Sequence, residues 1–308
     1  MAHPILIDTD MGGDDCLALA LAIASAALEV VGVVSVGGNV PVEQATDNIA
    51  RVLGVCRPSA MPRVARGADQ DDDALDDATS VFGADGLGGV AVGPPARVDV
   101  READEVYREL IGRYGASLAI AAIGPLTNLA GLLRRDPDLL RRAGRLVVMG
   151  GAVWCKGNVT PAAEFNFYRD PSAAAAVLSA GLDTTVVSLD LSRQVAFDES
   201  HLAHLAAGGG PVGAMLSKVL AVPVAHDGEV PPGRMLIHDA LAVASLIWPE
   251  LFLRTSTALA IATEGPDRGR SRPTVGGDAP KVRLLTTVNV VDLLENLLET
   301  LCGQRFVV

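Results

Sequence analysis

Four aspartates lie within one eight-residue segment near the N-terminus, Asp8-Thr9-Asp10-Met11-Gly12-Gly13-Asp14-Asp15. The apolar run 5–7 directly before them predicts a buried strand, so the acids follow its carboxyl end. Capping of the next helix accounts for one carboxylate, because a side-chain oxygen accepts the first free N–H groups. It does not account for four, which repel one another unless their charge is compensated. A hard divalent cation, which prefers oxygen ligands, is the simplest compensation; a capped turn with solvated acids is the alternative.

Polar segments also follow three other predicted strands. They are Gly37-Gly38-Asn39, the stretch from Gly124 to Asn128, and Gly150-Gly151 with the polar residues that come after it. Each is ordinary loop chemistry when taken alone, but the carboxyl ends of strands are where open α/β sheets bind ligands. Further on, His238-Asp239 precedes an apolar helix, where the aspartate could be a cap and the histidine structural.

Short β-branched runs alternate with longer Ala/Leu-rich segments, which predicts a mainly parallel sheet with helices on both faces. The predicted strands are residues 5–7, 30–36, 118–123, 146–149, 184–189 and 282–288. The predicted helices are residues 15–28, 42–53, 126–134, 137–143, 171–180, 211–222, 239–247 and 291–301. No internal repeat or long linker divides the chain, so we expect a single domain over residues 1–308.

Composition excludes several classes of protein. The 25 basic and 37 acidic side chains give a net charge of −12, which disfavours binding to nucleic acid or to an anionic membrane. No basic residue precedes Arg51 apart from His3, so a secretory signal is not expected. The four cysteines are widely spaced, as in a reduced cytoplasmic protein. The acid-rich stretch 69–77 is interpreted as a solvated loop rather than a metal site.

The motifs described above occur in one order that resembles the nucleoside hydrolase family, the inosine–uridine-preferring nucleoside N-ribohydrolases. The resemblance runs from Ile5 to the C-terminal helix, and the Asp-rich opening is its most specific part. It implies a Rossmann-like α/β nucleoside hydrolase fold and Ca²⁺-dependent hydrolysis of purine or pyrimidine ribonucleosides to free base and ribose, as in nucleoside salvage. It also implies a homodimer or homotetramer.

The resemblance implies a role for each matching residue at the metal and at the reacting bond. A Ca²⁺ ion that binds the attacking water would have three carboxylate ligands and one main-chain carbonyl: Asp10, Asp15, Asp239 and Thr127. Asp10 would also take the proton of that water, while His238 would assist departure of the base.

The resemblance also implies a set of residues for the sugar and the base. Met149 would lie beneath the ribose, and its hydroxyls would be bound by Asp14, Asn39, Asn158, Glu164 and Asn166. Phe82 stands where relatives that accept inosine and uridine commonly have histidine, and loop 227–235 lacks their aromatic and basic residues. The candidates for the base pocket are therefore Phe82, Trp154 and His226, and the preferred base stays open.

Two other classes of function remain in competition at this point. Asp8-Thr9-Asp10 after a first strand superficially resembles haloacid-dehalogenase-type phosphatases, but Lys156, Lys218 and Lys281 lie in no suitable motif. A non-catalytic nucleoside- or ribose-binding relative is the third hypothesis, which the presence of both Asp10 and His238 disfavours.

Overall fold

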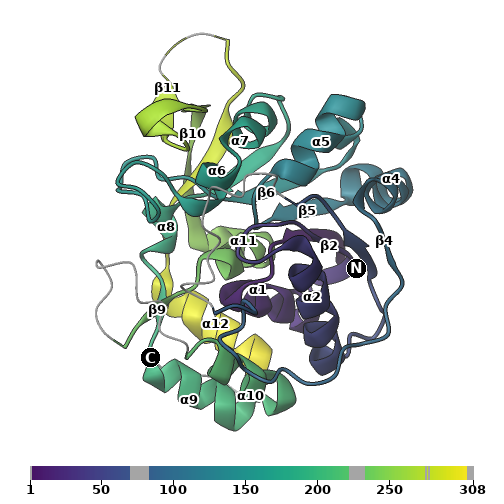
Figure 1. Cartoon of the computed structure of the whole chain (residues 1–308). Coiled ribbons are helices and arrows are strands. Elements are labelled where there is room, and N and C mark those ends of the chain that lie inside the picture. Colours follow the sequence, from purple (N-terminus) through teal and green to yellow (C-terminus); the bar gives the residue numbers. More distant parts are fainter. Residues whose placement is uncertain (1, 70–82, 222–232, 275, 277, 304–308) are drawn as a thin grey trace.

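The computed structural model describes residues 2–69, 83–221, 233–274, 276 and 278–303 (Figure 1). One ten-stranded sheet runs through it in the order β11-β10-β12-β7-β6-β5-β1-β2-β3-β4. Only the pairings of β10 with β11 and with β12 are antiparallel, so the sheet is mainly parallel, as predicted. Its strands are β1 (His3–Thr9), β2 (Leu28–Ser35), β3 (Arg63–Arg66), β4 (Val100–Glu102), β5 (Ala119–Ala122), β6 (Arg145–Met149), β7 (Thr184–Val187), β10 (Phe252–Ile261), β11 (Ser271–Thr274) and β12 (Val282–Val288).

Strand β1 occupies the point where the strand order reverses. It pairs in parallel with β2 on one side and with β5 on the other. In an open α/β sheet, such a switch point leaves a crevice beyond the carboxyl ends of the strands, because successive connections diverge to opposite faces. The Asp-rich segment follows β1 directly and therefore lies at this crevice.

Helices cover both faces of the sheet, and each face has its own apolar core. Along β1, Ile5 and Ile7 belong to one buried cluster and Leu6 to the other, as the two-residue period of a strand requires. The helices of the first face are α1 (Gly13–Ala24), α2 (Val42–Cys56), α9 (Glu199–Gly208), α10 (Gly210–Val219), α11 (His238–Ile247) and α12 (Val290–Cys302). Those of the second are α4 (Ala103–Tyr114), α5 (Thr127–Arg135) and α7 (Pro171–Leu178).

Several predicted boundaries were wrong. Helix α1 ends at Ala24 rather than at 28, and Leu28 already begins β2, because an uninterrupted apolar run does not mark where the chain turns. The predicted helix 137–143 is only a 3-10 turn over Leu140–Arg142. Leu139 and Leu140 are buried there, but the segment is too short to form an α-helix. Helices α4 and α9 and strands β3, β4, β10 and β11 have no counterpart among the predicted elements.

Outside the main sheet, the short strands β8 (Ala196–Phe197) and β9 (Met235–Leu236) pair in an antiparallel ribbon. Within the residues that the structure describes, every helix is too short or too polar to cross a bilayer.

Candidate active site

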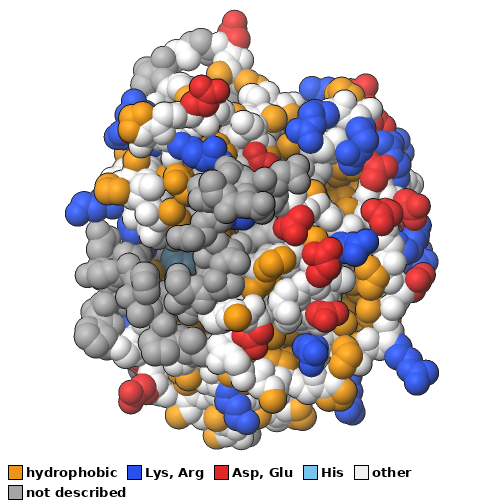
Figure 2. Space-filling view, viewed as in Figure 1, with side chains coloured by type: hydrophobic (Ala, Val, Ile, Leu, Met, Phe, Trp, Pro, Cys, Tyr) orange, Lys and Arg blue, Asp and Glu red, His pale blue; other side chains and the backbone are white. Residues whose placement is uncertain are grey.

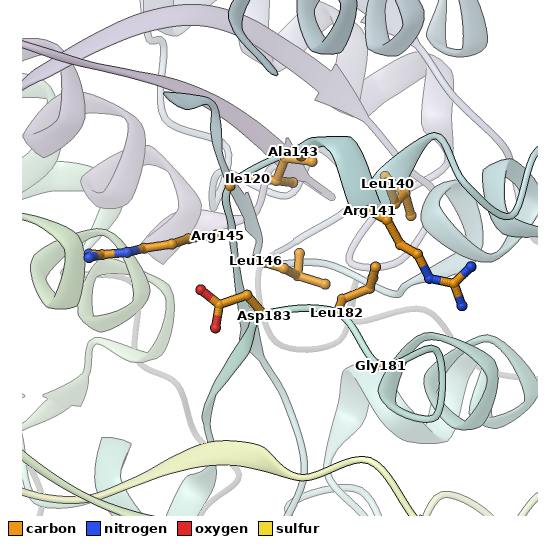
Figure 3. Close-up of a pocket in the computed structure, with 10 residues that line it drawn as sticks. Ile120, Leu140, Arg141, Ala143, Arg145, Leu146, Gly181, Leu182 and Asp183 are labelled. Atoms are coloured by element: carbon orange, nitrogen blue, oxygen red, sulfur yellow. The ribbon is translucent and has the colours of Figure 1, made fainter. Parts of the chain in front are cut away.

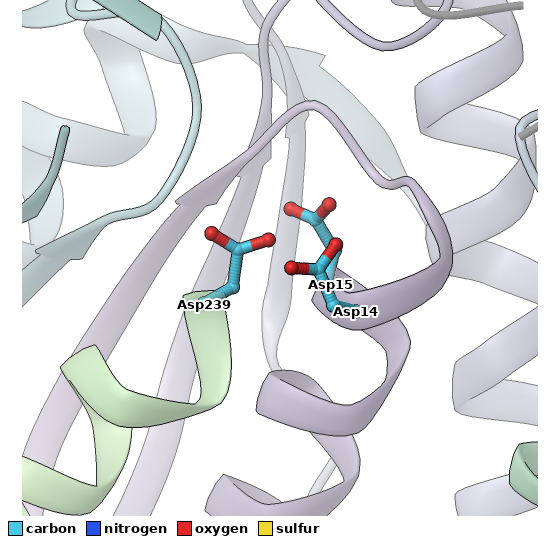
Figure 4. A group of neighbouring side chains, drawn as sticks. All are labelled: Asp14, Asp15 and Asp239. Carbon is cyan, nitrogen blue, oxygen red and sulfur yellow. The ribbon is translucent and has the colours of Figure 1, made fainter. Parts of the chain in front are cut away.

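Four buried carboxylates meet at the carboxyl end of β1, and we call them the acid cluster: Asp10, Asp14, Asp15 and Asp239. Asp14 and Asp15 lie in the first turn of α1, and Asp239 lies in the first turn of α11, which packs against α1. Figure 4 shows the Asp239 side chain extending from α11 toward the carboxylates of Asp14 and Asp15. All four side chains are at most 5% exposed. The tertiary structure thus brings Asp239, near the C-terminal end of the chain, to the Asp-rich segment near the N-terminus.

The acid cluster has no protein counter-charge among the described residues, where no lysine, arginine or histidine forms an ion pair with it. Burial raises the pKa of each of its carboxyls, and that of Asp14 reaches about 7. The charge of Asp15 raises the pKa values of Asp10 and Asp14 further. Carboxyls with raised pKa values in a crevice are typical of functional sites, because keeping them ionised needs a positive partner, and the described residues provide none here.

The oxygen chemistry of the cluster fits a hard divalent cation. One carboxylate oxygen from each of Asp14, Asp15 and Asp239 lies within 4.8 Å of the others. The buried Oδ1 atom of Asp10 accepts no hydrogen bond, so it remains available to a ligand. Asp14, which the resemblance assigned to ribose, is therefore part of the close set, whereas Asp10 lies beside it. No sulfur or imidazole belongs to this close set, a donor composition that suits Ca²⁺ or Mg²⁺ better than zinc.

The loop after β2 holds Asp10 and Asp15 in place. The Asn39 N–H donates to Asp10 Oδ2 at 2.8 Å, and its side-chain amide donates to Asp15 Oδ2 at 3.2 Å. The second Asp15 oxygen accepts the Thr9 hydroxyl, and the Gly12 N–H donates to Asp15 Oδ2. A Cβ on Gly38 would lie 2.2 Å from Asp10 Oδ2, so only glycine permits this close approach. The Gly-Gly-Asn segment therefore shapes the cluster.

Asp8 supports the loops around the site. Its Oδ2 accepts hydrogen bonds from the Tyr107 hydroxyl and from Asn128 Nδ2. Asn128 also donates to the Ser35 carbonyl and accepts from the Ala68 N–H, so it ties together β1, the end of β2 and the segment after β3. Its neighbour Thr127 begins α5, where its hydroxyl donates to Asp170 Oδ2 at 2.8 Å. Sequence reasoning noted Asn128 and Asp170 as polar residues after predicted strands without giving them a role, and it missed Tyr107, because nothing local to β1 points to it.

Of the residues expected at the ribose, Asn39, Met149 and Asn166 lie buried at the same edge. The Asn166 side-chain amide donates to the carbonyls of Ile123 and Met149, at 3.0 and 3.2 Å. It thereby links the end of β6 to the segment after β5. Asn158 is exposed, and its side chain accepts the Phe165 N–H.

Glu164 has a structural role in addition to the predicted one. Its carboxylate accepts the N–H groups of Gly151, Asn166 and Phe167, and so caps α6 (Phe165–Arg169). The side chain is 1% exposed, and burial raises its pKa against the effect of these three donors. The cap anchors Asn166 to the glycine pair that ends β6.

His238 begins α11, directly before Asp239, and is half-buried. Its Nδ1 lies 2.8 Å from the hydroxyl oxygen of Ser192, a residue that sequence reasoning missed. Trp154, one of the base-pocket candidates, is 59% exposed, and its N–H donates to Asp190. The other two candidates, Phe82 and His226, lie outside the described residues.

An open cavity of about 320 Å³ lies at the amino ends of the strands, on the opposite side of the sheet from the acid cluster (Figure 3). It is lined by residues at the amino ends of the strands, among them Ile120, Arg145 and Leu146. Figure 3 shows Arg141 and Arg145 extending in opposite directions from it. It contains no member of the acid cluster, so its size is no guide to the chemistry.

Comparison with known proteins agrees with the geometry. The sequence model of the family described as "Inosine-uridine preferring nucleoside hydrolase" matches residues 5–295. Uridine nucleosidase 1 of Arabidopsis thaliana is 32% identical to the chain over 270 residues, which cover 85% of the chain and 79% of the relative. The pyrimidine-specific ribonucleoside hydrolase RihA of Salmonella enteritidis is 34% identical, and 86% of each sequence is covered.

Solved structures give the same answer for the fold. The chain superposes on a plant nucleoside hydrolase, the PpNRh1 enzyme, with a TM-score of 0.90 at 27% sequence identity. The superposition covers 99% of the chain and 100% of that enzyme, so no large part of either fold lacks a counterpart.

Proposed function

The chain belongs to the inosine-uridine preferring nucleoside hydrolase family and hydrolyses the N-glycosidic bond of ribonucleosides, and we propose that it does so with Ca²⁺ held by the acid cluster. The observation that carries this proposal is the meeting of buried carboxylates at the switch point with no counter-charge from the described residues. The proposed ligands are Asp10, Asp15, Asp239 and the carbonyl of Thr127, with Asp14 close by. When bound, the ion supplies positive charge that orients the attacking water and lowers its pKa.

Asp10 is the proposed general base. Its Oδ2 is held by the Asn39 N–H, while the orphaned Oδ1 can accept a proton. As the water oxygen bonds to C1′ of the ribose, its proton passes to this carboxylate and the bond from C1′ to the base nitrogen breaks. The sugar gains oxocarbenium character in this step, and the surrounding carboxylates stabilise the developing positive charge.

The ribose is held by the polar residues at the crevice, and the proposed set is Asp14, Asn39, Asn158, Glu164 and Asn166, with Met149 beneath the ring. Asn166 and Glu164 are already fixed by hydrogen bonds to the backbone, and Asn39 is fixed by its bond to the Asp15 carboxylate, so little order has to be gained on binding. A site built to pair each hydroxyl discriminates strongly against substrates that lack one. We therefore propose that 2′-deoxynucleosides are poor substrates.

His238 is the proposed donor to the departing base. A nucleobase leaves poorly as an anion, so a proton or hydrogen bond supplied to it lowers the barrier. The position of His238 supports this assignment, since it begins α11 directly before Asp239, a member of the acid cluster. The proposed base pocket consists of Trp154 with Phe82 and His226, and a pyrimidine preference is supported by the names of the two curated relatives.

We also propose a domain organisation, a location and an oligomeric state for the protein. The continuous ten-stranded sheet supports one domain over residues 1–308. The cysteines Cys16, Cys56, Cys155 and Cys302 are all free thiols, which supports a cytoplasmic location. A role in nucleoside salvage is proposed from the reaction, which yields free base and ribose. A homodimer or homotetramer is proposed from the family alone.

The test measures release of free base from uridine, cytidine, inosine, adenosine and guanosine, with and without a calcium-selective chelator. We expect chelation to abolish hydrolysis and added Ca²⁺ to restore it, whereas added Zn²⁺ should not. Full activity in demonstrably metal-free protein would contradict the proposed metal. Restoration by Zn²⁺ but not by Ca²⁺ would identify a different ion.

A further inference from the structure

A short helix, α8 (Leu189–Ser192), follows β7 at the active-site edge of the sheet. Its last residue, Ser192, is completely buried, and its hydroxyl oxygen lies 2.8 Å from His238 Nδ1. This contact joins the last residue of α8 to the first residue of α11, although the two residues are 46 positions apart in the sequence. The contact concerns the histidine that the proposed function places beside the departing base.

The burial of Ser192 indicates the direction of this hydrogen bond. A hydroxyl has one proton to donate and two lone pairs to accept with. Among the described residues, the imidazole is the partner that the Ser192 hydroxyl has, since the Ser192 N–H is bonded separately to the Ser188 carbonyl. Leaving a buried O–H donor unpaired costs more than leaving a lone pair unpaired. The hydroxyl therefore donates, and Nδ1 accepts.

A ring whose Nδ1 accepts a hydrogen bond has its proton on Nε2. The same contact restricts rotation of the imidazole, because the acceptor nitrogen must keep facing the hydroxyl. We propose that Ser192 is a positioning residue, which holds His238 in the orientation and tautomer that present an Nε2–H donor to the leaving base. The inference rests on the proposed function, since it requires His238 to act in departure of the base.

Helix α8 is well suited to hold the serine in place. The Leu189 N–H donates to the Gly151 carbonyl at 2.9 Å, which fastens the helix to the end of β6. Asp190 accepts the N–H groups of Val153 and Trp154, both at 2.8 Å, which ties the turn to the segment after β6. A side chain on such a tethered turn can fix its partner, whereas one on a free loop would move with it.

The kinetic test compares Ser192→Ala with Ser192→Thr, which keeps the hydroxyl, on uridine, inosine and p-nitrophenyl riboside. We expect Ser192→Ala to lower kcat on the nucleosides by roughly 10- to 100-fold, a part of what a general acid contributes. KM and turnover of p-nitrophenyl riboside should change by less than about threefold, because this leaving group needs no donor. Ser192→Thr should recover most of the loss.

Ser188→Ala is the matched control, because it removes another buried hydroxyl from the start of the same turn without touching His238. It should match Ser192→Ala in any loss of thermal stability but show no dependence on the leaving group. An equal loss on nucleosides and p-nitrophenyl riboside in Ser192→Ala would mean a purely structural serine and would overturn the inference.

A spectroscopic measurement tests the contact independently of activity. Nitrogen-15 NMR of the histidine rings, assigned with His238→Ala, should show the Nε2–H tautomer of His238 in the Ca²⁺-loaded enzyme. In Ser192→Ala, we expect a mixture of tautomers. An Nδ1–H tautomer in the unmodified enzyme would overturn the inference.

His238→Ala separates failure of the inference from failure of the proposed function. If His238→Ala impairs only the nucleosides and Ser192→Ala does not, the inference alone is wrong. If His238→Ala affects nucleosides and p-nitrophenyl riboside equally, or neither of them, the proposed role of His238 is wrong and the inference fails with it.

Discussion

The acid cluster and the charged surface of helix α4 both gather carboxylates, but in α4 each carboxylate faces an arginine. Asp104 lies 2.7 Å from Arg108 and 3.0 Å from Arg135, and Glu109 lies 3.0 Å from Arg63. We call this set the α4 network, and its members are Arg63, Arg101, Asp104, Glu105, Arg108, Glu109, Arg135 and Asp136. In Figure 2, red and blue side chains intermingle over the region where Figure 1 places α4 and α5.

The two regions also differ in the direction of their pKa shifts. Hydrogen bonds from Arg108 and Arg135 lower the pKa of Asp104, and a hydrogen bond from Arg101 lowers that of Glu109. In the acid cluster, burial raises the pKa of every carboxyl. The comparison teaches that the number of acids is not what marks a site. Buried acids without a counter-charge need a ligand, whereas exposed acids beside arginines already have their partners.

The largest effect should come from Asp10→Asn, which removes the proposed proton acceptor while keeping the shape of the side chain. We expect kcat on the preferred nucleoside to fall by roughly 10²- to 10⁴-fold or more, the scale of a lost general base. The thermal unfolding temperature of the variant, measured with Ca²⁺, shows whether the fold survives. Near-normal kcat in a folded variant would assign the base to another residue.

Asp239→Asn should change metal binding and stability in opposite directions. Removing one of the facing carboxylates relieves repulsion, so the Tm of the metal-free protein should rise. Affinity for Ca²⁺ should fall at least roughly tenfold, because affinity follows the charge of the ligands. Calorimetric titration and thermal melts measure the two effects. A lower metal-free Tm together with unchanged affinity for Ca²⁺ would show that Asp239 supports the fold and is not a metal ligand.

The pH dependence of stability distinguishes the two regions more finely. The pKa of Asp14 is about 7 in the folded protein against 3.8 ordinarily, so folding takes up protons in between. The contribution of Asp14 to the stability of the metal-free protein is therefore greatest below about pH 4, and it is lost as the pH rises through 7. We expect the metal-free Tm to drop by several degrees between pH 5 and pH 8.

Saturating Ca²⁺ should remove most of that drop, because it neutralises the acid cluster. The remainder belongs to Asp8 and Glu164, which lie outside the cluster. Burial raises the pKa of Asp8 to about 7 and also raises that of Glu164. A Tm that rises with pH in the metal-free protein would contradict the assignment of raised pKa values.

The smallest effect should come from Asp104→Asn in the α4 network. Exposed ion pairs contribute little, so we expect the Tm to change by no more than about 1–2 °C and kcat to stay as it is. The carboxylate is about one third exposed and the two arginines are more so, which leaves their charges well solvated. A Tm loss as large as the pH effect would show that the α4 network, too, stores substantial stability.

The sequence by itself determined what could be read from local patterns. Alternating apolar runs predicted a mainly parallel sheet, and the position of the Asp-rich segment after the first of them predicted where the site lies. Elements whose apolar period is weak were not predicted, and β10 is an example: it is an antiparallel strand with four consecutive exposed residues. The family motif gave the reaction, because motif and chemistry are inherited together over residues 5–295.

Only the tertiary structure decided which residues meet. The family resemblance grouped Asp239 with Asp10 and Asp15, but no spacing in the sequence indicates that α11 packs on α1 and brings Asp239 to Asp14 as well. The same is true of Ser192 with His238 and of Tyr107 with Asp8, partners 46 and 99 positions apart. The physical reason is that periodicity reports the local environment of a segment. Charge compensation and hydrogen bonding in a buried site depend instead on side chains that the packing of distant segments brings together.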